Sequence, residues 1–270
     1  NKQFNNLLLL IINNHKTIKM KNILYTFIAL FFSISLNAQF YWTSEHVEIN
    51  EGMEEEYEKF EAFWGVAKEK AIADGLQAGW SIWKVDPSSN DDNPWADYII
   101  INTYQSKEQM DANVDWMQLI QDAHKGKTKR SVIKKYIKES TDNKYRASSR
   151  SYTMQSISNL SEAGRDPSAP INATYIGMEA LNDDYVEFEK QYFREQHKGN
   201  KYWWDLSEIV DRSDNAYKPI THTIFEINKE NNGSSSEGSE QAFTDKMMSK
   251  YGYASREMHG WLQLTRIMKK

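Results

Sequence analysis

The sequence predicts an α+β protein in which one β-α-β-β-α-β unit occurs twice along the chain. The first observation is a pattern that recurs at a constant offset of 128 residues. Its members are Met53, Tyr57, Phe60, Glu61 and Trp64 in the first copy and Leu181, Tyr185, Phe188, Glu189 and Tyr192 in the second. The second observation is that strand-like and helix-like segments follow each copy in the same order. Together they predict two units of about 115 residues, which is an ordinary domain size.

The first unit is expected to span residues 39–160. Residues 40–49 are rich in aromatic and β-branched side chains and predict a strand. From Met53 the apolar positions recur every three or four residues as far as residue 71, which predicts a helix that ends at Gly75. The remaining segments are listed in chain order: a strand at 77–86, a loop of turn-forming residues at 87–94, a strand at 95–104, and a strand at 150–160.

The second helix of this unit is expected to begin after Ser106. Ser106 and Gln109 have the spacing of a capping box, in which each side chain satisfies a backbone N–H at the helix start. The apolar residues Met110, Val114 and Met117 continue with helical spacing. One helix is therefore predicted from residue 107 to at least residue 120, and it either continues or restarts after Gly126 toward Lys138.

The second unit is expected to span residues 171–270, after a linker at 161–170 that contains glycine and two prolines. Asn182 or Asp183 is suited to cap its first helix. Its strands are predicted at 171–180, 202–211, 220–228 and 257–268, and its second helix around 243–251.

Residues 1–38 are expected to lie outside both units, as an upstream segment followed by a signal peptide from Met20 to Ala38. Lys21 supplies a positive charge, and residues 23–36 form an apolar stretch that is shorter than the ~20 residues of a membrane-spanning helix. We therefore expect export to a secreted or periplasmic location, with no membrane attachment after the signal is removed. The alternative is a retained N-terminal anchor.

The composition excludes several classes of function. The chain has no cysteine, so disulfides, thiolate catalysis and cysteine-ligated metal centres are ruled out. Four of the 33 basic residues and none of the 38 acidic residues lie in 1–38, so the mature chain would carry a net charge of −9. An acidic domain is poorly suited to nucleic acid, because neutralisation of phosphates dominates that affinity. We expect a soluble protein that does not bind nucleic acid.

The β-α-β-β-α-β order is that of the ferredoxin-like arrangement, in which both helices cover one face of an antiparallel sheet. Two such units in tandem resemble the dimeric α/β-barrel superfamily over about residues 40–269. This superfamily includes antibiotic-biosynthesis monooxygenase-like, stress-responsive, chlorite-dismutase-like and dye-decolourising peroxidase families. The resemblance implies an intrachain barrel with a ligand between the sheets or between a sheet and its helices. The fold alone does not choose among these activities.

Alternation along the predicted strands indicates which side chains share a face. Ile99, Ile101 and Thr103 alternate with Tyr98, Ile100 and Asn102. If the first set packs under the helices, the second faces the space between the sheets. The residues predicted to bind a ligand on this basis are Tyr98, Asn102, Trp261 and Gln263. The alternative for the tryptophans is simple filling of the core.

Three polar residues are candidates for catalysis: His222, Glu226 and His259. Imidazole and carboxylate groups suit both general-base and metal-binding roles. Residues four apart on a strand are ~13 Å apart, so His222 and Glu226 are not expected to share a metal ion. We therefore predict no metal site, and hydrogen-bonded histidines are the alternative to a catalytic group.

His197 is a separate candidate, because it lies near the end of the first helix of the second unit. The surrounding segment is similar to the haem-ligating segment of chlorite-dismutase-like proteins, although Asn200 replaces a basic residue. The resemblance implies that the cofactor, if the chain has one, is haem ligated by His197. The alternative is a cation beside the carbonyl groups at the helix C-terminus.

The leading functional hypothesis is an exported barrel protein that binds a small apolar or aromatic molecule. A haem-dependent or cofactor-free oxidoreductase is the enzymatic alternative. A structural or stress-related protein that forms homo-oligomers is the third.

Overall fold

The computed structural model describes residues 40–89, 96–165, 169–229 and 243–270, with the backbone alone for 243–248. The predicted upstream segment and signal peptide lie outside the described residues. None of the helices in the described ranges is long and apolar enough to cross a membrane.

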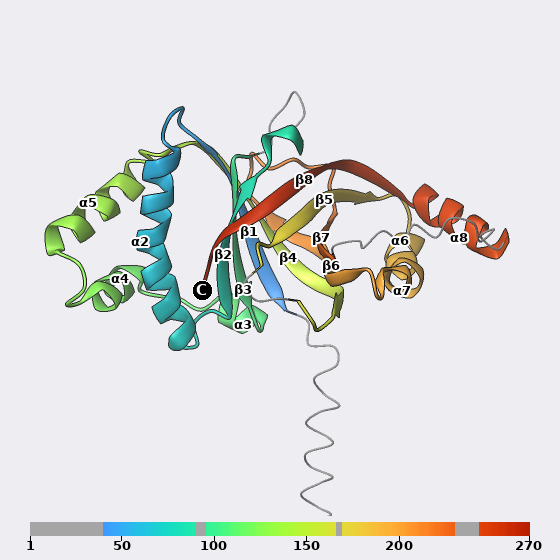
Figure 1. Cartoon of the computed structure of the whole chain (residues 1–270), viewed down its shortest axis with the longest axis horizontal. Helices are drawn as coiled ribbons and strands as arrows, with labels where there is room; N and C mark the ends of the chain where they lie inside the picture. The colour runs from blue at the N-terminus through green and yellow to red at the C-terminus, as the bar shows by residue number, and fades with distance from the viewer. Residues whose placement is uncertain (1–39, 90–95, 166–168, 230–242) are drawn as a thin grey trace, which may run out of the picture. The chain divides into compact units, whose positions relative to one another are not determined.

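Eight strands form a closed barrel with helices outside it (Figure 1). Their bounds are β1 Tyr41–Ile49, β2 Gly79–Val85, β3 Tyr98–Tyr104, β4 Arg146–Ser161, β5 Asn172–Ala180, β6 Lys201–Arg212, β7 His222–Asn228 and β8 Arg256–Lys269. The order around the barrel is β1-β3-β2-β8-β5-β7-β6-β4, and every neighbouring pair is antiparallel. The predicted α+β class is confirmed, with an antiparallel barrel as its centre.

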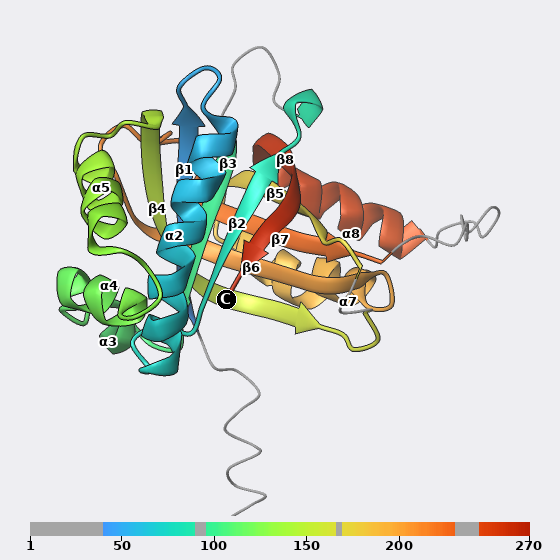
Figure 2. The same ribbon diagram turned by 60° about the vertical axis from the view of Figure 1, so that its left-hand side comes forward.

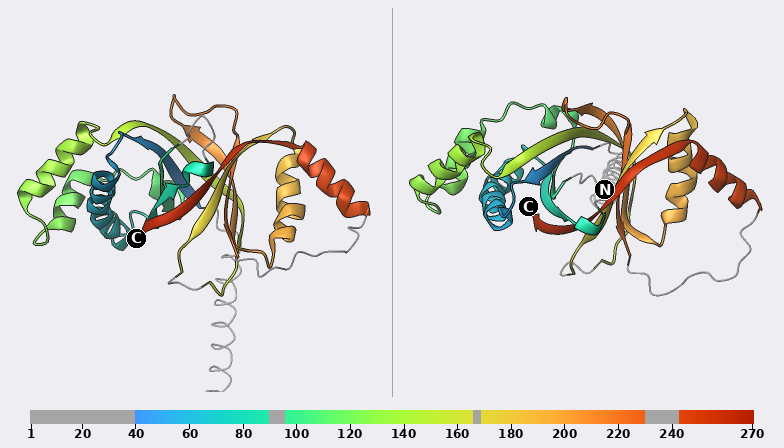
Figure 3. Two further views of the ribbon diagram at one scale, coloured as in Figure 1. Left: turned by 45° about the horizontal axis from the view of Figure 1, so that its top comes forward. Right: turned by 90° about the horizontal axis from the view of Figure 1, so that it is seen from above.

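Each half of the chain supplies four consecutive positions of the barrel. The first half contributes β4-β1-β3-β2, and the second contributes β8-β5-β7-β6, which is the same relative order. Two seams join the halves: β2 pairs with β8, and β4 pairs with β6. The top view in Figure 3 shows the helices of the two halves on opposite sides of the strands.

The helix α2, Glu54–Ala73, covers the outer face of the first-half strands (Figure 2). Its buried residues Tyr57 and Phe60 pack against Tyr98 and Ile100 of β3, as the apolar periodicity predicts. A short 3₁₀ turn, η2 Pro87–Ser89, follows β2.

The second helix predicted from residue 107 to at least residue 120 is wrong as a single element, whereas the alternative of a restart after Gly126 agrees with the structure. It is divided into α3 Lys107–Met110, α4 Trp116–His124 and α5 Arg130–Thr141. Ser106 caps α3, as predicted, and its hydroxyl accepts a hydrogen bond from the backbone N–H of Gln109. Asp115 then begins α4 by accepting from the backbone N–H of Gln118 at 3.0 Å. This new cap leaves Val114 between helices.

The outer face of the second half is covered by a helix with an irregular middle. It consists of α6 Asp184–Phe188, the π-helical turn η3 Glu189–Phe193 and α7 Arg194–His197. The helix α8, Phe243–Ala254, precedes β8. Tyr185 of α6 packs with Trp204, Leu206 and Ile224 on the outer side of the strands.

The internal repeat has a structural counterpart in two buried ion pairs. Glu61 of α2 accepts from the Arg146 guanidinium at 3.1 Å, and Glu189 of η3 pairs with Arg256. In both halves the arginine begins the last strand, and the side chain of the glutamate is at most 3% exposed. The equivalent positions of the two copies therefore do the same structural task.

The assignment of the two strand faces from the sequence is reversed in the structure. Ile99, Ile101 and Phe225 lie in the barrel interior with Trp42 and its neighbours. Tyr98 and Ile100 lie under α2, and Ile224 lies under α6. The reason is that both faces of these strands are apolar and covered, so alternation alone does not say which face is inside.

Candidate functional site

A cavity of about 320 Å³, which we call the lumen cavity, is lined by residues of the barrel interior. Its aromatic walls are formed by Phe40, Trp42, Trp83, Trp203 and Phe225. These rings pack with one another, for example Trp83 edge-on to Phe225 at 5.2 Å between centroids. The polar lining residues are Ser81, Thr103, Asp205, Arg266 and Lys269. The cavity is thus an apolar slot with a few polar groups, which is the usual character of a small-molecule site.

Asp205 places a carboxyl group in the wall of the lumen cavity. Its side chain points inward because it alternates along β6 with outward residues, and it is only 1% exposed. The Ser156 hydroxyl donates to one carboxyl oxygen and the Ser207 hydroxyl to the other, both at 2.5 Å. Burial raises the pKa of Asp205 to about 6, although these hydrogen bonds act in the opposite direction. Near neutral pH this group can therefore exchange a proton or accept a hydrogen bond.

Two cations line the same cavity from β8. Arg266 follows Leu262 and Leu264 on the inward face, and its guanidinium lies 5.8 Å from the centroid of the Trp83 ring. Lys269 is exposed near the end of the strand. The cavity consequently has a carboxyl group and two cationic groups on its lining.

His46 lies elsewhere in the barrel interior and was missed from the sequence. Its ring is between those of Tyr152 and Tyr175, each 5.1 Å away between centroids. Burial, with a smaller contribution from the charge of Arg150, lowers the pKa of His46 to about 3. This imidazole is therefore neutral and does not line the lumen cavity.

The residues predicted to bind a ligand do not gather in the lumen cavity. Tyr98 donates its hydroxyl hydrogen to Glu58 of α2 at 2.9 Å. Asn102 also faces the helix, where it accepts from the Lys68 ammonium at 2.9 Å. Both lie in the first half, on the side opposite to the space between the sheets. Ligand binding by these residues stays a prediction.

Trp261 and Gln263 project from the outer face of β8, because Leu262 and Leu264 point inward. Trp261 is 42% exposed. The Gln263 side chain donates to the Thr174 hydroxyl at 3.2 Å. Their predicted role in binding also stays untested.

The three catalytic candidates have separate surroundings. His222 bonds through Nδ1 with the Thr221 hydroxyl at 2.8 Å, and burial lowers its pKa to about 4. Glu226 forms an ion pair with Lys201 at 2.6 Å. The hydrogen-bond partners of His259 are different residues, Glu179 and Tyr217. A joint catalytic group of all three is therefore not assembled, and a role for any one of them remains a prediction.

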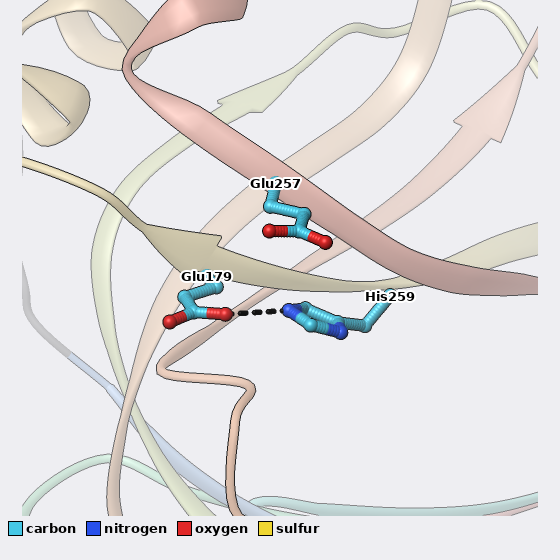
Figure 4. A group of neighbouring side chains, drawn as sticks. All are labelled: Glu179, Glu257 and His259. Atoms are coloured by element: carbon cyan, nitrogen blue, oxygen red, sulfur yellow. Dashed lines mark hydrogen bonds and ion pairs between the residues drawn. The ribbon is translucent and has the colours of Figure 1, made fainter.

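His259 instead belongs to a cluster with Glu179 and Glu257 (Figure 4). Its Nε2 atom lies 2.6 Å from a Glu179 carboxylate oxygen, and its Nδ1 atom lies 3.1 Å from the Tyr217 hydroxyl. Glu179 and Glu257 are directly opposed on the neighbouring strands β5 and β8. The imidazole, when protonated, offsets the repulsion of these two carboxylates. One ligand atom from each of the three residues lies within 4.8 Å of the others, a donor set that is also compatible with a metal ion.

His197 lines a different cavity of about 320 Å³, between the outer face of the second-half strands and the helices. The other lining residues include Ile176, Met178, Ile224 and Arg256. Burial, together with the charges of Lys201 and Arg256, lowers the pKa of His197 to about 4. A neutral imidazole beside apolar walls is a suitable axial ligand for haem iron. The volume is near the lower end of the ~300–1,000 Å³ range of ligand pockets. The His197 imidazole therefore suits haem iron, whereas the cavity is small for a haem molecule.

Solved structures with a similar fold include an anthrone oxidase-like protein, with 9% identity over 87% of this chain and 94% of that one and a TM-score of 0.46. A monooxygenase-like protein from Lactobacillus acidophilus NCFM matches with 12% identity, coverage of 86% and 95%, and a TM-score of 0.48. A mutant chlorite dismutase from Candidatus Nitrospira defluvii matches with 7% identity, coverage of 85% and 92%, and a TM-score of 0.44. No protein-family model and no curated protein matches the chain.

The resemblance to the dimeric α/β-barrel superfamily inferred from the sequence stays a prediction. At such low identities and TM-scores the likeness concerns the fold and says nothing about the activity of this chain. The function has to be inferred from its own cavities and side chains.

Proposed function

We propose that this chain is a duplicated ferredoxin-like protein that binds a small aromatic or apolar molecule in the lumen cavity. The duplication is supported by the shared strand order of the two halves and by the repeated glutamate–arginine pairs. A single chain then supplies both sheets of the barrel, and the cavity between them is lined by residues of both halves.

The observation that carries the proposal is the composition of the cavity wall. Five aromatic side chains surround a volume of about 320 Å³, which is within the range of small-molecule sites. Rings held in this way bind flat apolar molecules through stacking and edge contacts. Asp205 adds a polar group whose position is fixed by Ser156 and Ser207.

The proposal is tested by titrating the mature protein with indole and with benzyl alcohol, using calorimetry and the emission of the lining tryptophans. Binding should be saturable and should weaken about tenfold or more in Ile227→Phe, which adds volume to the cavity wall; tenfold corresponds to about 1.4 kcal/mol. Val210→Phe is the control, because Val210 is exposed on the outer face of β6. Equal binding by both variants, or no binding by the wild-type protein, would contradict the proposal.

Haem-dependent oxidation is the second candidate, and the neutral His197 imidazole is the observation that favours it. Haem would supply redox chemistry when bound, with His197 holding its iron and the apolar side chains around it excluding water. Adding haem to the purified protein should then give a shifted Soret absorption band that is lost in His197→Ala. An unshifted band, or one unaffected by the substitution, removes this candidate.

We also propose export directed by the segment from Met20 to Ala38. Expression of the full sequence in a bacterial host should release a periplasmic or secreted product. Its N-terminal residue should be Gln39, as determined by intact mass. A product of full length that remains in the cytoplasm would contradict this proposal.

A further inference from the structure

The charged groups around the lumen cavity differ in whether they have partners within the protein. Both oxygens of the Asp205 carboxyl accept hydrogen bonds from serine hydroxyls. Asp205 forms no ion pair with Arg266 or Lys269, although all three line the cavity. Within the described ranges, neither Arg266 nor Lys269 has a carboxylate within ion-pair distance. Both cations are therefore available to pair with a negatively charged group in the cavity.

A third cation, Arg165, adds positive charge beside Arg266. Burial lowers the pKa of Arg266, and the positive charge of Arg165 lowers it further. Arg165 itself has a buried guanidinium nitrogen, Nη1, with no hydrogen-bond partner in the part of the chain that the structure describes. Bringing two guanidinium groups together at a partly buried site costs free energy, and a bound anion offsets that cost.

We propose that the ligand of the lumen cavity is an aromatic anion whose acidic group is bound by Arg266 and Lys269. This inference rests on the proposed binding function and specifies the chemical class of the ligand. The planar guanidinium of Arg266 can form two parallel hydrogen bonds with a carboxylate. Its place above the Trp83 ring puts that contact directly beside the aromatic walls.

The polar lining residues indicate which groups a ligand would carry. Its acidic group is at Arg266 and Lys269, near the C-terminal end of β8, and its ring lies between aromatic side chains such as Trp83 and Phe225. A hydroxyl on the ring can donate to Asp205, which lines the same cavity and whose carboxyl oxygens have further acceptor capacity. Small hydroxylated aromatic carboxylic acids therefore fit the site best.

Three ligands of almost the same size test this inference: 4-hydroxyphenylacetate, the neutral 4-hydroxyphenylacetamide, and the cationic tyramine. Calorimetry on the mature protein at pH near neutral and low salt should show the anion binding at least tenfold more tightly than the amide. Its affinity should fall as salt is added, because the contact with Lys269 is exposed. The affinity of the amide should change little with salt.

Substitutions then locate the contact. Arg266→Gln and Lys269→Gln should each reduce the preference for the anion over the amide, while binding of the amide is retained. Lys250→Gln is the matched control for Lys269→Gln, since it removes the same charge from an exposed position on α8. The wild-type ligand series and Lys269→Gln keep the test decisive if Arg266→Gln does not fold.

The possible results separate this inference from the proposed function. Equal binding of the three ligands, or tightest binding of tyramine, overturns the anionic class but leaves binding in the lumen intact. A preference for the anion that survives both substitutions overturns its placement at Arg266 and Lys269. Absence of binding by all three ligands and by indole overturns the proposed function itself.

Discussion

Replacement of Asp205 by asparagine should remove a large part of the pH dependence of stability. Burial raises the pKa of this carboxyl from 3.8 to about 6 in the folded protein. The folded state therefore keeps the proton to higher pH than the unfolded chain does. Stability from this group is fully present below pH ~4 and is lost as the pH rises through about 6.

The size of the effect follows from the pKa values. A rise from 3.8 to about 6 corresponds to ~3 kcal/mol, because one pKa unit is worth about 1.36 kcal/mol. Asparagine has a similar shape and can still form hydrogen bonds with Ser156 and Ser207, since hydroxyl groups both donate and accept. The variant should thus gain ~3 kcal/mol relative to the wild-type protein between about pH 4 and pH 7.

Urea-induced unfolding of both proteins at several pH values measures this difference directly. Other titrating groups affect both proteins alike and largely cancel in the comparison. Asp211→Asn is the control, because Asp211 is exposed on the same strand. A difference between Asp205→Asn and the wild-type protein that is constant with pH, or that changes in the opposite direction, would refute the reasoning.

Three further predictions concern stability, measured as the free energy of unfolding in urea. Arg146→Ala should cost about 3–5 kcal/mol, because it leaves the buried carboxylate of Glu61 without its partner. Gly252→Ala should cost about 1–3 kcal/mol, since the added Cβ would lie 2.6 Å from the Phe193 ring. Glu257→Gln should raise stability at pH ~8 by about 0.2–1 kcal/mol, because it removes the repulsion from the opposing glutamate of β5.

Each of these predictions has a matched comparison. Lys59→Ala breaks an exposed ion pair on α2 and should have a much smaller effect than Arg146→Ala; similar losses would contradict the buried-pair explanation. Adding Phe193→Leu to Gly252→Ala should recover part of the loss if the steric account is correct. Glu208→Gln, at an exposed position of β6, should not reproduce the gain of Glu257→Gln, and an equal gain would point to net charge instead.

Helical periodicity identified the first helix well, because α2 has one buried stripe and a solvent-facing side. The positions of Tyr57 and Phe60 under that helix follow directly from their spacing. The second helix was harder to predict, since the apolar spacing from Met110 to Met117 continues through residues that are not helical. The cap at Asp115 starts a new helix, and a local hydrogen bond of this kind competes with helix continuation.

Alternation along the strands did not determine which of their two faces points into the barrel. Tyr98, Ile99, Ile100 and Ile101 are all buried, because one set contacts the helix and the other contacts the barrel interior. A strand covered on both sides reads as continuously apolar. Because of this ambiguity, the predicted site included Tyr98 and Asn102, which face α2.

The signal for the lumen cavity was nevertheless present in β6. Asp205 and Ser207 share the parity of Trp203 and Ile209 along β6. A carboxyl group on the same face as these apolar residues indicates a buried hydrogen-bonded group, and its serine partner two residues away agrees with this interpretation. The partner Ser156 comes from another strand, so the full arrangement depends on tertiary contacts that no local pattern contains.

The two seams of the barrel have a consequence for any half-length version of the chain. Residues 39–160 alone would retain α2 but would leave the edges of β2 and β4 without β8 and β6. Unpaired edges readily pair with another chain, so such a fragment should self-associate as long as its strands form. Covalent linkage of the halves keeps their local concentration high and favours closure within one molecule over assembly between molecules.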